Sequence, residues 1–265
     1  MNALERFTQQ SSSEFAIRPF LLHEPERVMG YMLKWSLNEN EHVRRFSSEG
    51  CRPRLPWGIS LPMFKSDPSP IFKVLKNLMA DPSLYVRKSV ANNLNDITKD
   101  NPKAVLELSQ KWIGYSSETN WILRHGCRTL IRKANPTALD LFGYTDFSDE
   151  NPLFKNATLT VSLDELQIEN RCKLNYSLDI IWNTPAHIRL EYGIDFIKSN
   201  GSPSRKLFLL SDKTVPGGSH LSGRRTHSFA DLTTRKHYPG IHRITLLLNG
   251  KEAAQTILNI TGGKK

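Results

Sequence analysis

Three predicted helices in the N-terminal half share one short pattern, and this internal repeat limits the fold more than any other feature of the sequence. An apolar residue followed by two cationic or imidazole side chains recurs at Val43-Arg44-Arg45, Val86-Arg87-Lys88 and Leu123-Arg124-His125, with offsets of 43 and 37 residues. Another predicted helix with its own apolar stripe precedes each one, at residues 25–37, 70–80 and 102–113. Two helices in each unit of about 40 residues are typical of HEAT-like repeats, which stack into a curved α-solenoid with a concave binding surface.

The second helix of the middle unit, predicted over residues 83–99, has an unusual composition. Its buried stripe consists of Val86, Val90, Leu94 and Ile97. Three amides and one carboxylate lie close together near its end: Asn92, Asn93, Asn95 and Asp96. Asparagine disfavours helices because its side chain competes for backbone hydrogen bonds. The cluster therefore indicates either a polar helix end packed on the next repeat or a functional site.

The periodicity changes from helical to alternating after an acidic segment at residues 145–152. Seven strands are predicted at residues 157–168, 171–183, 186–198, 205–216, 224–234, 241–249 and 251–261. Seven strands without helices favour an immunoglobulin-like β-sandwich. Cys172 is its one cysteine, so the inter-sheet disulfide of antibody domains is absent. The predicted division is a helical domain at 1–146, a linker at 147–155 and a sandwich at 156–262.

Charge and cysteine content narrow the class of partner. The chain has a formal net charge of +10, and residues 151–265 carry 16 Lys and Arg against 9 Asp and Glu. This surplus indicates a polyanionic partner, with nucleic acid the first candidate and plain solubility charge the alternative. Three dispersed cysteines indicate a reducing cytoplasm and give no metal-binding spacing, and no apolar run is long enough to span a membrane. We expect no metal and no cofactor, which disfavours a metal-dependent hydrolase.

Two groups of basic residues are candidates for contacts with phosphate. The repeat register aligns Arg44, Arg45, Arg87, Lys88 and Arg124 along the solenoid, and Arg128, four residues after Arg124, is a further candidate. The alternative is that the register arginines form ion pairs between repeats, with Asp81, Asp67 or Glu41 as acceptors. In the second half, residues 215–225 read as a Gly-rich basic loop that ends in Arg224 and Arg225, and it is interpreted as a clamp on duplex DNA or as a flexible hairpin tip. Arg235, Lys236, His237 and Arg243 would extend that patch.

Four segments together resemble a known family. They are SSSEFAIRPF (11–20), HVRRFSSEGCRPRLPW (42–57), DPSLYVRKSVANNLNDITKD (81–100) and NWILRHGCRTLIRKA (120–134). They resemble the AlkC branch of the HEAT-repeat DNA glycosylases, some of which carry an Ig-like domain after the helices. The resemblance implies excision of cationic N3-methylated adenine and cytosine from double-stranded DNA without base flipping, by a bacterial, nucleoid-associated monomer. The family usually has two or three further repeats ahead of the first motif, so we expect a shortened concave surface here.

The resemblance also implies which residues act. The family's active-site carboxylates fall on Glu14, Glu49 and Asp96, which we expect to form an acidic pocket. An N3-methylated base is already cationic and needs no general acid, whereas carboxylates near the sugar stabilise an oxocarbenium-like transition state and orient water. Further candidates for base and sugar contacts are Trp57, Trp121 and Asn92, although a Trp in such repeats often belongs to the core. The alternative function is a non-catalytic HEAT–Ig adaptor that binds DNA or protein.

Overall fold

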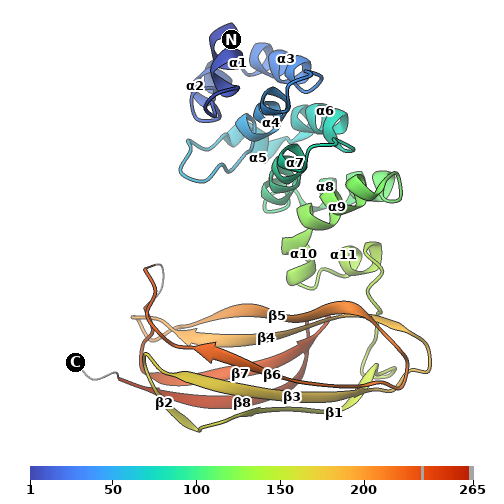
Figure 1. Cartoon of the computed structure of the whole chain (residues 1–265), viewed down its shortest axis with the longest axis vertical. Helices are drawn as coiled ribbons and strands as arrows, with labels where there is room; N and C mark the ends of the chain where they lie inside the picture. The colour runs from blue at the N-terminus through green and yellow to red at the C-terminus, as the bar shows by residue number, and fades with distance from the viewer. Residues whose placement is uncertain (234–235, 263–265) are drawn as a thin grey trace. The chain divides into compact units, whose positions relative to one another are not determined.

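The computed structural model describes residues 1–233 and 236–262 and falls into two compact units, Met1–Lys133 and Ala134–Lys265. The first unit is helical and the second is a β-sandwich preceded by one short helix (Figure 1). The predicted fold class, a helical-repeat region followed by an Ig-like sandwich, is confirmed. In the described part of the chain, no helix is both long and apolar enough to cross a bilayer.

The helices of the first unit pair as the repeat predicted. They are α1 (Asn2–Thr8), α2 (Arg18–His23), α3 (Pro25–Trp35), α4 (Glu41–Gly50), α5 (Pro62–Ser66), α6 (Ser69–Leu78), α7 (Leu84–Ile97), α8 (Pro102–Trp112), α9 (Ser117–Gly126) and α10 (Arg128–Arg132). The second helices of successive units form a row in which α4 packs on α7 and α7 on α9, while α3 packs on α6. The register residues that the sequence aligned therefore lie on neighbouring helices.

Proline and side-chain caps set the helix starts. Asn40 accepts a hydrogen bond from the backbone of His42 at the start of α4, and Ser116 accepts one from Thr119 at the start of α9. Pro19 lies in the first turn of α2, where its missing N–H costs nothing, so this proline starts a helix. The segment 120–134, which contains the third copy of the repeated pattern, is divided between α9 and α10, and these helices are separated at Cys127.

The centre of the helical core is α7. The predicted stripe of Val86, Val90 and Leu94 is fully buried. A Cβ added to Gly126 would lie 2.9 Å from the Cβ of Leu94, so α9 approaches α7 as closely as backbones permit only because this position is glycine. With its stripe used for packing, α7 directs its polar positions toward α4 and α9, and this places the functional candidates described below.

The sandwich has two sheets, with strand orders β1-β3-β6 and β2-β8-β7-β4-β5. The strands are β1 (Phe154–Val161), β2 (Glu165–Gln167), β3 (Arg171–Ile180), β4 (Ala186–Ile197), β5 (Pro203–Val215), β6 (His220–Ser228), β7 (Gly240–Leu248) and β8 (Lys251–Thr261). All pairings are antiparallel except that of β2 with β8. Inward-facing residues of both sheets, among them Leu178, Ile188 and Ile244, form one buried core.

Two expectations for the sandwich are wrong in detail. The strand expected at 157–168 is split into β1 and β2, which belong to different sheets. The Gly-rich segment at 215–225 is not one loop, because β6 begins at His220 and both Arg224 and Arg225 lie within it. The connection consists of residues 216–219 with Gly217 and Gly218 at its centre, and a Cβ on Gly217 would lie 2.3 Å from the backbone carbonyl carbon of Asn183. The basic pair is therefore held on a strand of fixed register, paired with β3.

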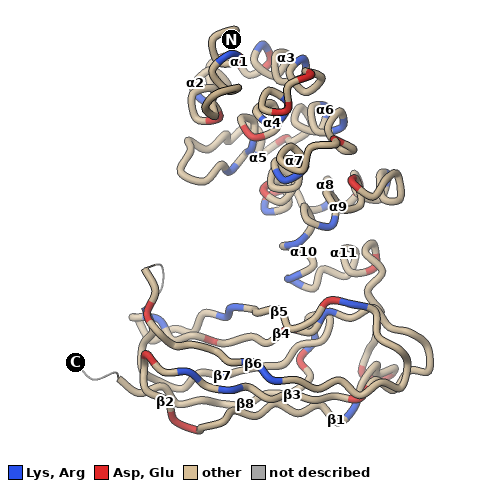
Figure 2. Tube along the Cα trace, viewed as in Figure 1, with Lys and Arg blue, Asp and Glu red and all other residues tan. Residues whose placement is uncertain are grey.

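The segment that joins helices to strands packs on the sandwich. The second unit includes α11 (Pro136–Leu141) and residues 147–155, which the sequence assigned to the helical domain and to a linker. Phe147 and Leu153 are buried in the sandwich core, and Asn249 donates a hydrogen bond to the carbonyl of Thr145 (2.9 Å). Figure 2 shows the basic residues of this unit spread over several strands, including β3 and β6.

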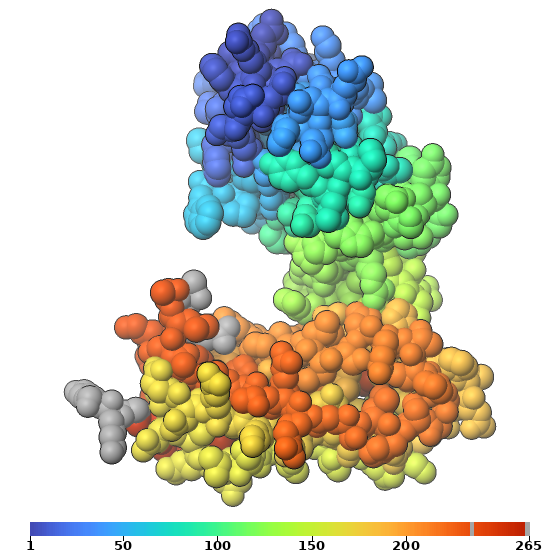
Figure 3. Space-filling model, viewed as in Figure 1, coloured from blue at the N-terminus to red at the C-terminus, as the bar shows by residue number. Residues whose placement is uncertain are grey.

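The loop between α4 and α5 protrudes from the helical unit. It is drawn light blue in Figures 1 and 3. Pro53 and Leu61 join its two limbs through a backbone hydrogen bond of 3.1 Å. Its apolar limbs are buried at Leu55 and Leu61, whereas its tip extends into solvent. The loop therefore has an exposed tip, and the limbs that support the tip are packed against the helical unit.

Candidate active site

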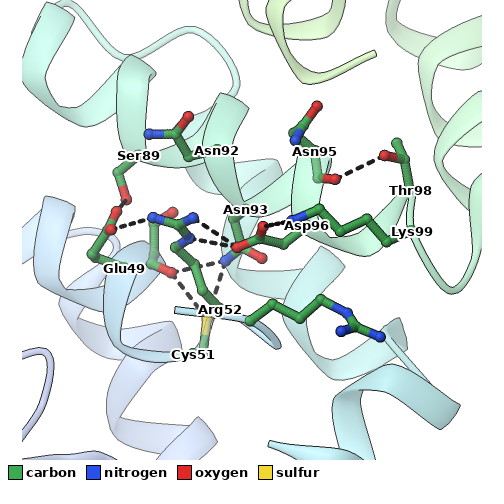
Figure 4. Close-up of polar contacts among 12 residues, drawn as sticks. Glu49, Cys51, Arg52, Ser89, Asn92, Asn93, Asn95, Asp96, Thr98 and Lys99 are labelled. Atoms are coloured by element: carbon green, nitrogen blue, oxygen red, sulfur yellow. Dashed lines mark hydrogen bonds and ion pairs between the residues drawn. The ribbon is translucent and has the colours of Figure 1, made fainter. Parts of the chain in front are cut away.

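Two of the predicted catalytic carboxylates meet at one arginine. Glu49 lies in the last turn of α4, Asp96 lies in α7, and Arg52 follows directly after α4. Arg52 places Nη1 2.5 Å from Oε1 of Glu49 and Nη2 2.7 Å from Oδ2 of Asp96 (Figure 4). Glu49 is 5% exposed and Asp96 2%. Both carboxylates are therefore held at the α4–α7 interface by a shared cation.

The remaining oxygens of these carboxylates also have partners. Ser89 Oγ donates to Glu49 Oε2 at 2.6 Å, and Lys99 Nζ lies 2.9 Å from Asp96 Oδ1 (Figure 4). The side chain of Lys99 is 45% exposed, against 3% for that of Asp96. The solvent side of Asp96 is thus covered by an ammonium group.

Glu14 joins the cluster through a second arginine. Arg45 Nη1 lies 3.1 Å from Oε2 of Glu14 and its Nη2 lies 3.7 Å from Oε1 of Glu49. Ser12 accepts a further hydrogen bond from Arg45 at 2.5 Å. Carboxylates and cations consequently alternate in one chain of contacts, which we call the ionic row: Glu14, Arg45, Glu49, Arg52, Asp96 and Lys99.

The ionic row is formally neutral, with three carboxylates and three cations. Burial opposes the charge on Arg52, but the neighbouring Glu49 and Asp96 outweigh it and raise the pKa of Arg52 above the ordinary arginine value. Buried charges are tolerated only when paired and hydrogen-bonded in this way. The sequence predicted an acidic pocket, whereas the structure shows carboxylates that are each compensated by a cation.

Two of the three asparagines of α7 are buried against neighbouring helices, and the third is half-buried. Asn93 is buried and donates to the carbonyl of Ser48 in α4 (2.8 Å), and Asn95 accepts from Thr129 in α10 (2.8 Å). These two amides join α7 to its neighbours, as the alternative of a polar helix packed on the next repeat anticipated. Asn92 is half-buried and accepts from Arg128 Nη2 at 3.0 Å.

The basic register residues have different environments. Arg44 forms a bidentate pair with Asp81 (2.7 and 3.1 Å), which is the ion pair between repeats that the alternative reading predicted. Arg87 donates to the carbonyls of Asp81 and Pro82. Lys88 is exposed, and Arg124 and Arg128 are half-buried. The row of cations is therefore partly used for packing between repeats.

Trp57 is the most exposed large hydrophobic residue among those described. It is 99% exposed, at the tip of the loop between α4 and α5. The N–H of Gly58 bonds the carbonyl of Leu55 at 3.1 Å, so Pro56 and Trp57 are the central residues of a β-turn. Trp57 has φ +59°, as the third position of a type II turn requires, and a left-handed conformation costs a non-glycine residue about 1–2 kcal/mol. Backbone strain of this kind is concentrated at active sites and ligand-binding segments of proteins.

Trp121 is a less prominent aromatic on α9. It is 37% exposed and stacks on His125, with ring centroids 5.0 Å apart and an interplanar angle of 7°. Burial first, then the charges of Arg128 and Lys88, lower the pKa of His125. The stacked pair therefore lies within reach of the charges of Arg128 and Lys88.

Arg224 and Arg225 occupy consecutive positions of β6. Arg224 donates to Asn175 Oδ1 across the β3–β6 pair at 2.9 Å. Because successive side chains of a strand alternate, Arg225 points to the opposite face of the sheet. Of the other residues expected in this patch, Arg235 lies outside the described residues. In the described part of the chain, no three His, Cys, Asp or Glu side chains cluster in a way that could hold a metal ion.

Comparison with known proteins places the chain in a family. Residues 9–130 match the family model described as DNA alkylation repair enzyme, and residues 155–262 match the C-terminal Ig-like domain of the uncharacterised protein YhaZ. YhaZ of Bacillus subtilis (strain 168) is 46% identical over 251 residues, which cover 95% of this chain and 69% of YhaZ. The structure of Pseudomonas fluorescens alkylpurine DNA glycosylase AlkC, bound to DNA containing an abasic site analog, is 41% identical with a TM-score of 0.93 and covers 98% of this chain and 71% of AlkC. The chain belongs to the AlkC-type DNA alkylation repair family.

Arg52 is a member of the ionic row that the sequence did not single out. Glu14, Glu49 and Asp96 were named through the family motifs, whereas Arg52 was named neither as a catalytic nor as a binding residue. A signal was present, since Arg52 follows Glu49 by three residues and could reach it. Its second contact, with Asp96, joins positions 44 residues apart and depends on the packing of α4 against α7.

Proposed function

We propose that this chain is a DNA glycosylase of base excision repair, which hydrolyses the N-glycosidic bond of cationic alkylated bases such as N3-methyladenine and N3-methylcytosine in double-stranded DNA. The observation that carries the proposal is the ionic row, which brings Glu14, from the turn before α2, together with Glu49 of α4 and Asp96 of α7. The likeness to AlkC bound to DNA with an abasic site analog supports DNA as the partner. The alkylated base remains in the duplex in this proposal.

The chemistry requires little from a general acid. An N3-methylated base leaves with the electrons of the C1′–N bond and becomes neutral, while positive charge develops on the deoxyribose. Asp96 and Glu49 stabilise that charge, and Asp96 accepts a proton from the water whose oxygen bonds to C1′. Lys99 covers Asp96 in the free protein, so in this mechanism its ammonium moves to a DNA phosphate and the cationic sugar takes its place.

The DNA contacts follow from exposure and charge. Trp57, exposed on its strained turn, enters the duplex beside the lesion, and the face of the indole attracts the cationic base. Trp121 and Asn92 contact the base or sugar from α9 and α7. The phosphate contacts are Arg44, Arg45, Arg87, Lys88, Arg124, Arg128, Arg224 and Arg225, and those whose guanidinium already has a carboxylate partner contribute least. We propose a monomer that acts in the bacterial cytoplasm at the nucleoid.

The alternative is a non-catalytic adaptor that binds DNA or protein. An adaptor gains nothing from a buried row of carboxylates and cations, since such a row costs desolvation that apolar packing avoids. Release of N3-methyladenine from methylated duplex DNA separates the two functions. We expect release by the unaltered chain, a loss of about 100-fold or more in Asp96→Asn, and little change in Asp67→Asn, whose exposed carboxylate lies at the start of α6. Absence of release by the unaltered, folded chain would favour the adaptor.

A further inference from the structure

Arg18 in α2 is a fully buried arginine whose hydrogen-bond acceptors are all backbone carbonyls. It is 0% exposed. Its Nη1 donates to the carbonyls of Gly50 (3.1 Å) and Arg52 (2.9 Å), and its Nε donates to the carbonyl of Ile59. Its Nη2 has no hydrogen-bond partner among the described residues. Arg18 is thus not a member of the ionic row, but it contacts the row through the backbone carbonyl of Arg52.

Burying a guanidinium without a carboxylate partner carries a large unfavourable free energy of desolvation. Burial lowers the pKa of Arg18 to about 10, which still leaves the group charged at neutral pH. Apolar side chains of similar volume would fill the same space without the desolvation penalty. Packing alone therefore does not account for Arg18. Its fork of fixed N–H directions, which lysine lacks, matches three carbonyls that point from different directions.

The three carbonyls belong to both limbs of the loop between α4 and α5. Gly50 is the last residue of α4, Arg52 starts the outgoing limb, and Ile59 lies on the returning limb. The Cδ of Arg18 also lies 3.3 Å from the position that a Cβ on Gly58 would take. Arg18 therefore joins the two limbs below the turn that carries Trp57.

The indole itself does not hold the turn. Trp57 is 99% exposed, so its indole has almost no packing within the chain. Its positive φ is unfavourable for a residue with a side chain and persists only where the surrounding structure enforces it. Within the loop the enforcing contacts include the backbone hydrogen bonds of Gly58 and Leu61. From outside the loop, Asp100 pairs with Arg54 on the outgoing limb (2.8 and 2.6 Å), whereas Arg18 bonds carbonyls of both limbs.

We propose that Arg18 is a positioning residue that fixes the loop between α4 and α5 so that Trp57 is held in its strained, exposed conformation before DNA binds. This proposal rests on the proposed glycosylase function, in which Trp57 enters the duplex at the lesion. Holding the loop in advance lowers the entropy that binding must otherwise overcome. It also keeps the indole in register with Glu49, because the Gly50 carbonyl, one residue beyond Glu49, is bonded by the same guanidinium.

The first test measures the loop directly and does not require activity. Hydrogen exchange followed by mass spectrometry on peptides covering residues 53–61 reports the amides of Gly58 and Leu61. We expect exchange there to rise about tenfold or more in Arg18→Met, an amount that corresponds to losing about one hydrogen bond, and to rise less in Arg18→Lys. Gly58→Ala, which presses on Arg18 and Leu55, is expected to loosen the same peptides without removing the charge. Val105→Ala, a cavity variant in α8, controls for general destabilisation.

The second test asks whether Arg18 acts through Trp57. Single-turnover release of N3-methyladenine is compared for Arg18→Met, Trp57→Ala and the double variant. We expect Arg18→Met to lower the rate about tenfold or more in the native background, since small misplacements are costly in an active site. In the Trp57→Ala background the same change is expected to lower it by less than about threefold, because residues that act together are non-additive.

The outcomes separate this proposal from the proposed function. Unchanged exchange at 53–61 in Arg18→Met would overturn the positioning role, whatever the activity and whatever the result for Gly58→Ala. Equal losses of rate in the two backgrounds would also overturn it, since Arg18 would then act independently of Trp57. If the unaltered chain releases no base, the glycosylase function fails, while the exchange measurement still decides whether Arg18 holds the loop. A role in stability alone predicts that Val105→Ala loosens residues 53–61 as much as Arg18→Met does.

Discussion

Removal of Arg52 tests the ionic row most directly. In Arg52→Met, Glu49 and Asp96 lose their shared cation at an interface where both are nearly inaccessible. Breaking a buried pair by removing one partner costs about 3–5 kcal/mol, because the remaining charge is left uncompensated. Ser89 and Lys99 still bond the far oxygens of the two carboxylates, so we expect the lower end, about 3 kcal/mol.

Urea unfolding followed by circular dichroism at 222 nm reports the helical unit. With an m-value of about 1–3 kcal/mol/M, a loss of 3 kcal/mol moves the midpoint down by about 1 M or more. The matched control is Arg52→Met combined with Asp96→Asn, which removes one of the two carboxylates that lose their shared cation and is expected to recover about half of the loss. A loss below about 1 kcal/mol in Arg52→Met, or no recovery in the double variant, would refute the view that the row is a buried and mutually compensating set.

Three further outcomes are expected. Burial first lowers the pKa of His242, so the folded state binds fewer protons than the unfolded state and the sandwich should lose stability as the pH falls below about 6.5; this acid-dependent loss, measured by urea unfolding, should shrink in His242→Gln. In Gly250→Ala the new Cβ lies 2.0 Å from the Cβ of Ala134 and the residue keeps a φ of +81°, so the free energy of unfolding, measured by thermal unfolding, should fall by more than about 2 kcal/mol. Gly201 has a φ of +77° but open space around it, so Gly201→Ala should lower the free energy of unfolding by about 1 kcal/mol. Arg224→Ala and Arg225→Ala should each weaken binding to any duplex and reduce the slope of log K against log salt by about one, as measured by fluorescence anisotropy, and unchanged affinity and slope would exclude a clamping role for β6.

The large elements of the fold could be predicted because they depend on periodicity within a segment. The stripe of α7 and the alternation of β3 are local patterns, and both appear at the expected positions. The predictions are wrong where a local sequence signal conflicts with the pairing of strands. The glycines at 217, 218 and 223 suggested one long loop, yet Gly223 pairs with Tyr176 inside β6, where a Cβ would lie 2.4 Å from the Tyr176 hydroxyl. Gly223 leaves room for the ring of Tyr176, and the sequence alone does not distinguish a glycine with this role from a glycine in a turn.

The candidate site likewise has a part that could be predicted from local sequence and a part that depends on packing. Glu14, Glu49 and Asp96 could be named from motifs, but their compensation by Arg45 and Arg52 depends on how α4 meets α7. The exposure of Trp57 could not be foreseen either. A Trp between two prolines and a glycine has the composition of a connector, and only the turn geometry reveals that its ring has no place in the core.

Under the proposed function, the neutrality of the ionic row also affects how the protein would move along an undamaged duplex. Unpaired carboxylates facing DNA would repel each phosphate that passes, and such repulsion would slow sliding wherever no lesion is present. With three negative and three positive groups in contact, the row has no net monopole, so its field decreases with distance faster than that of a single charge. In that proposal the surrounding lysines and arginines would dominate the attraction to phosphate, and the carboxylates would act mainly on a positive charge in direct contact with them.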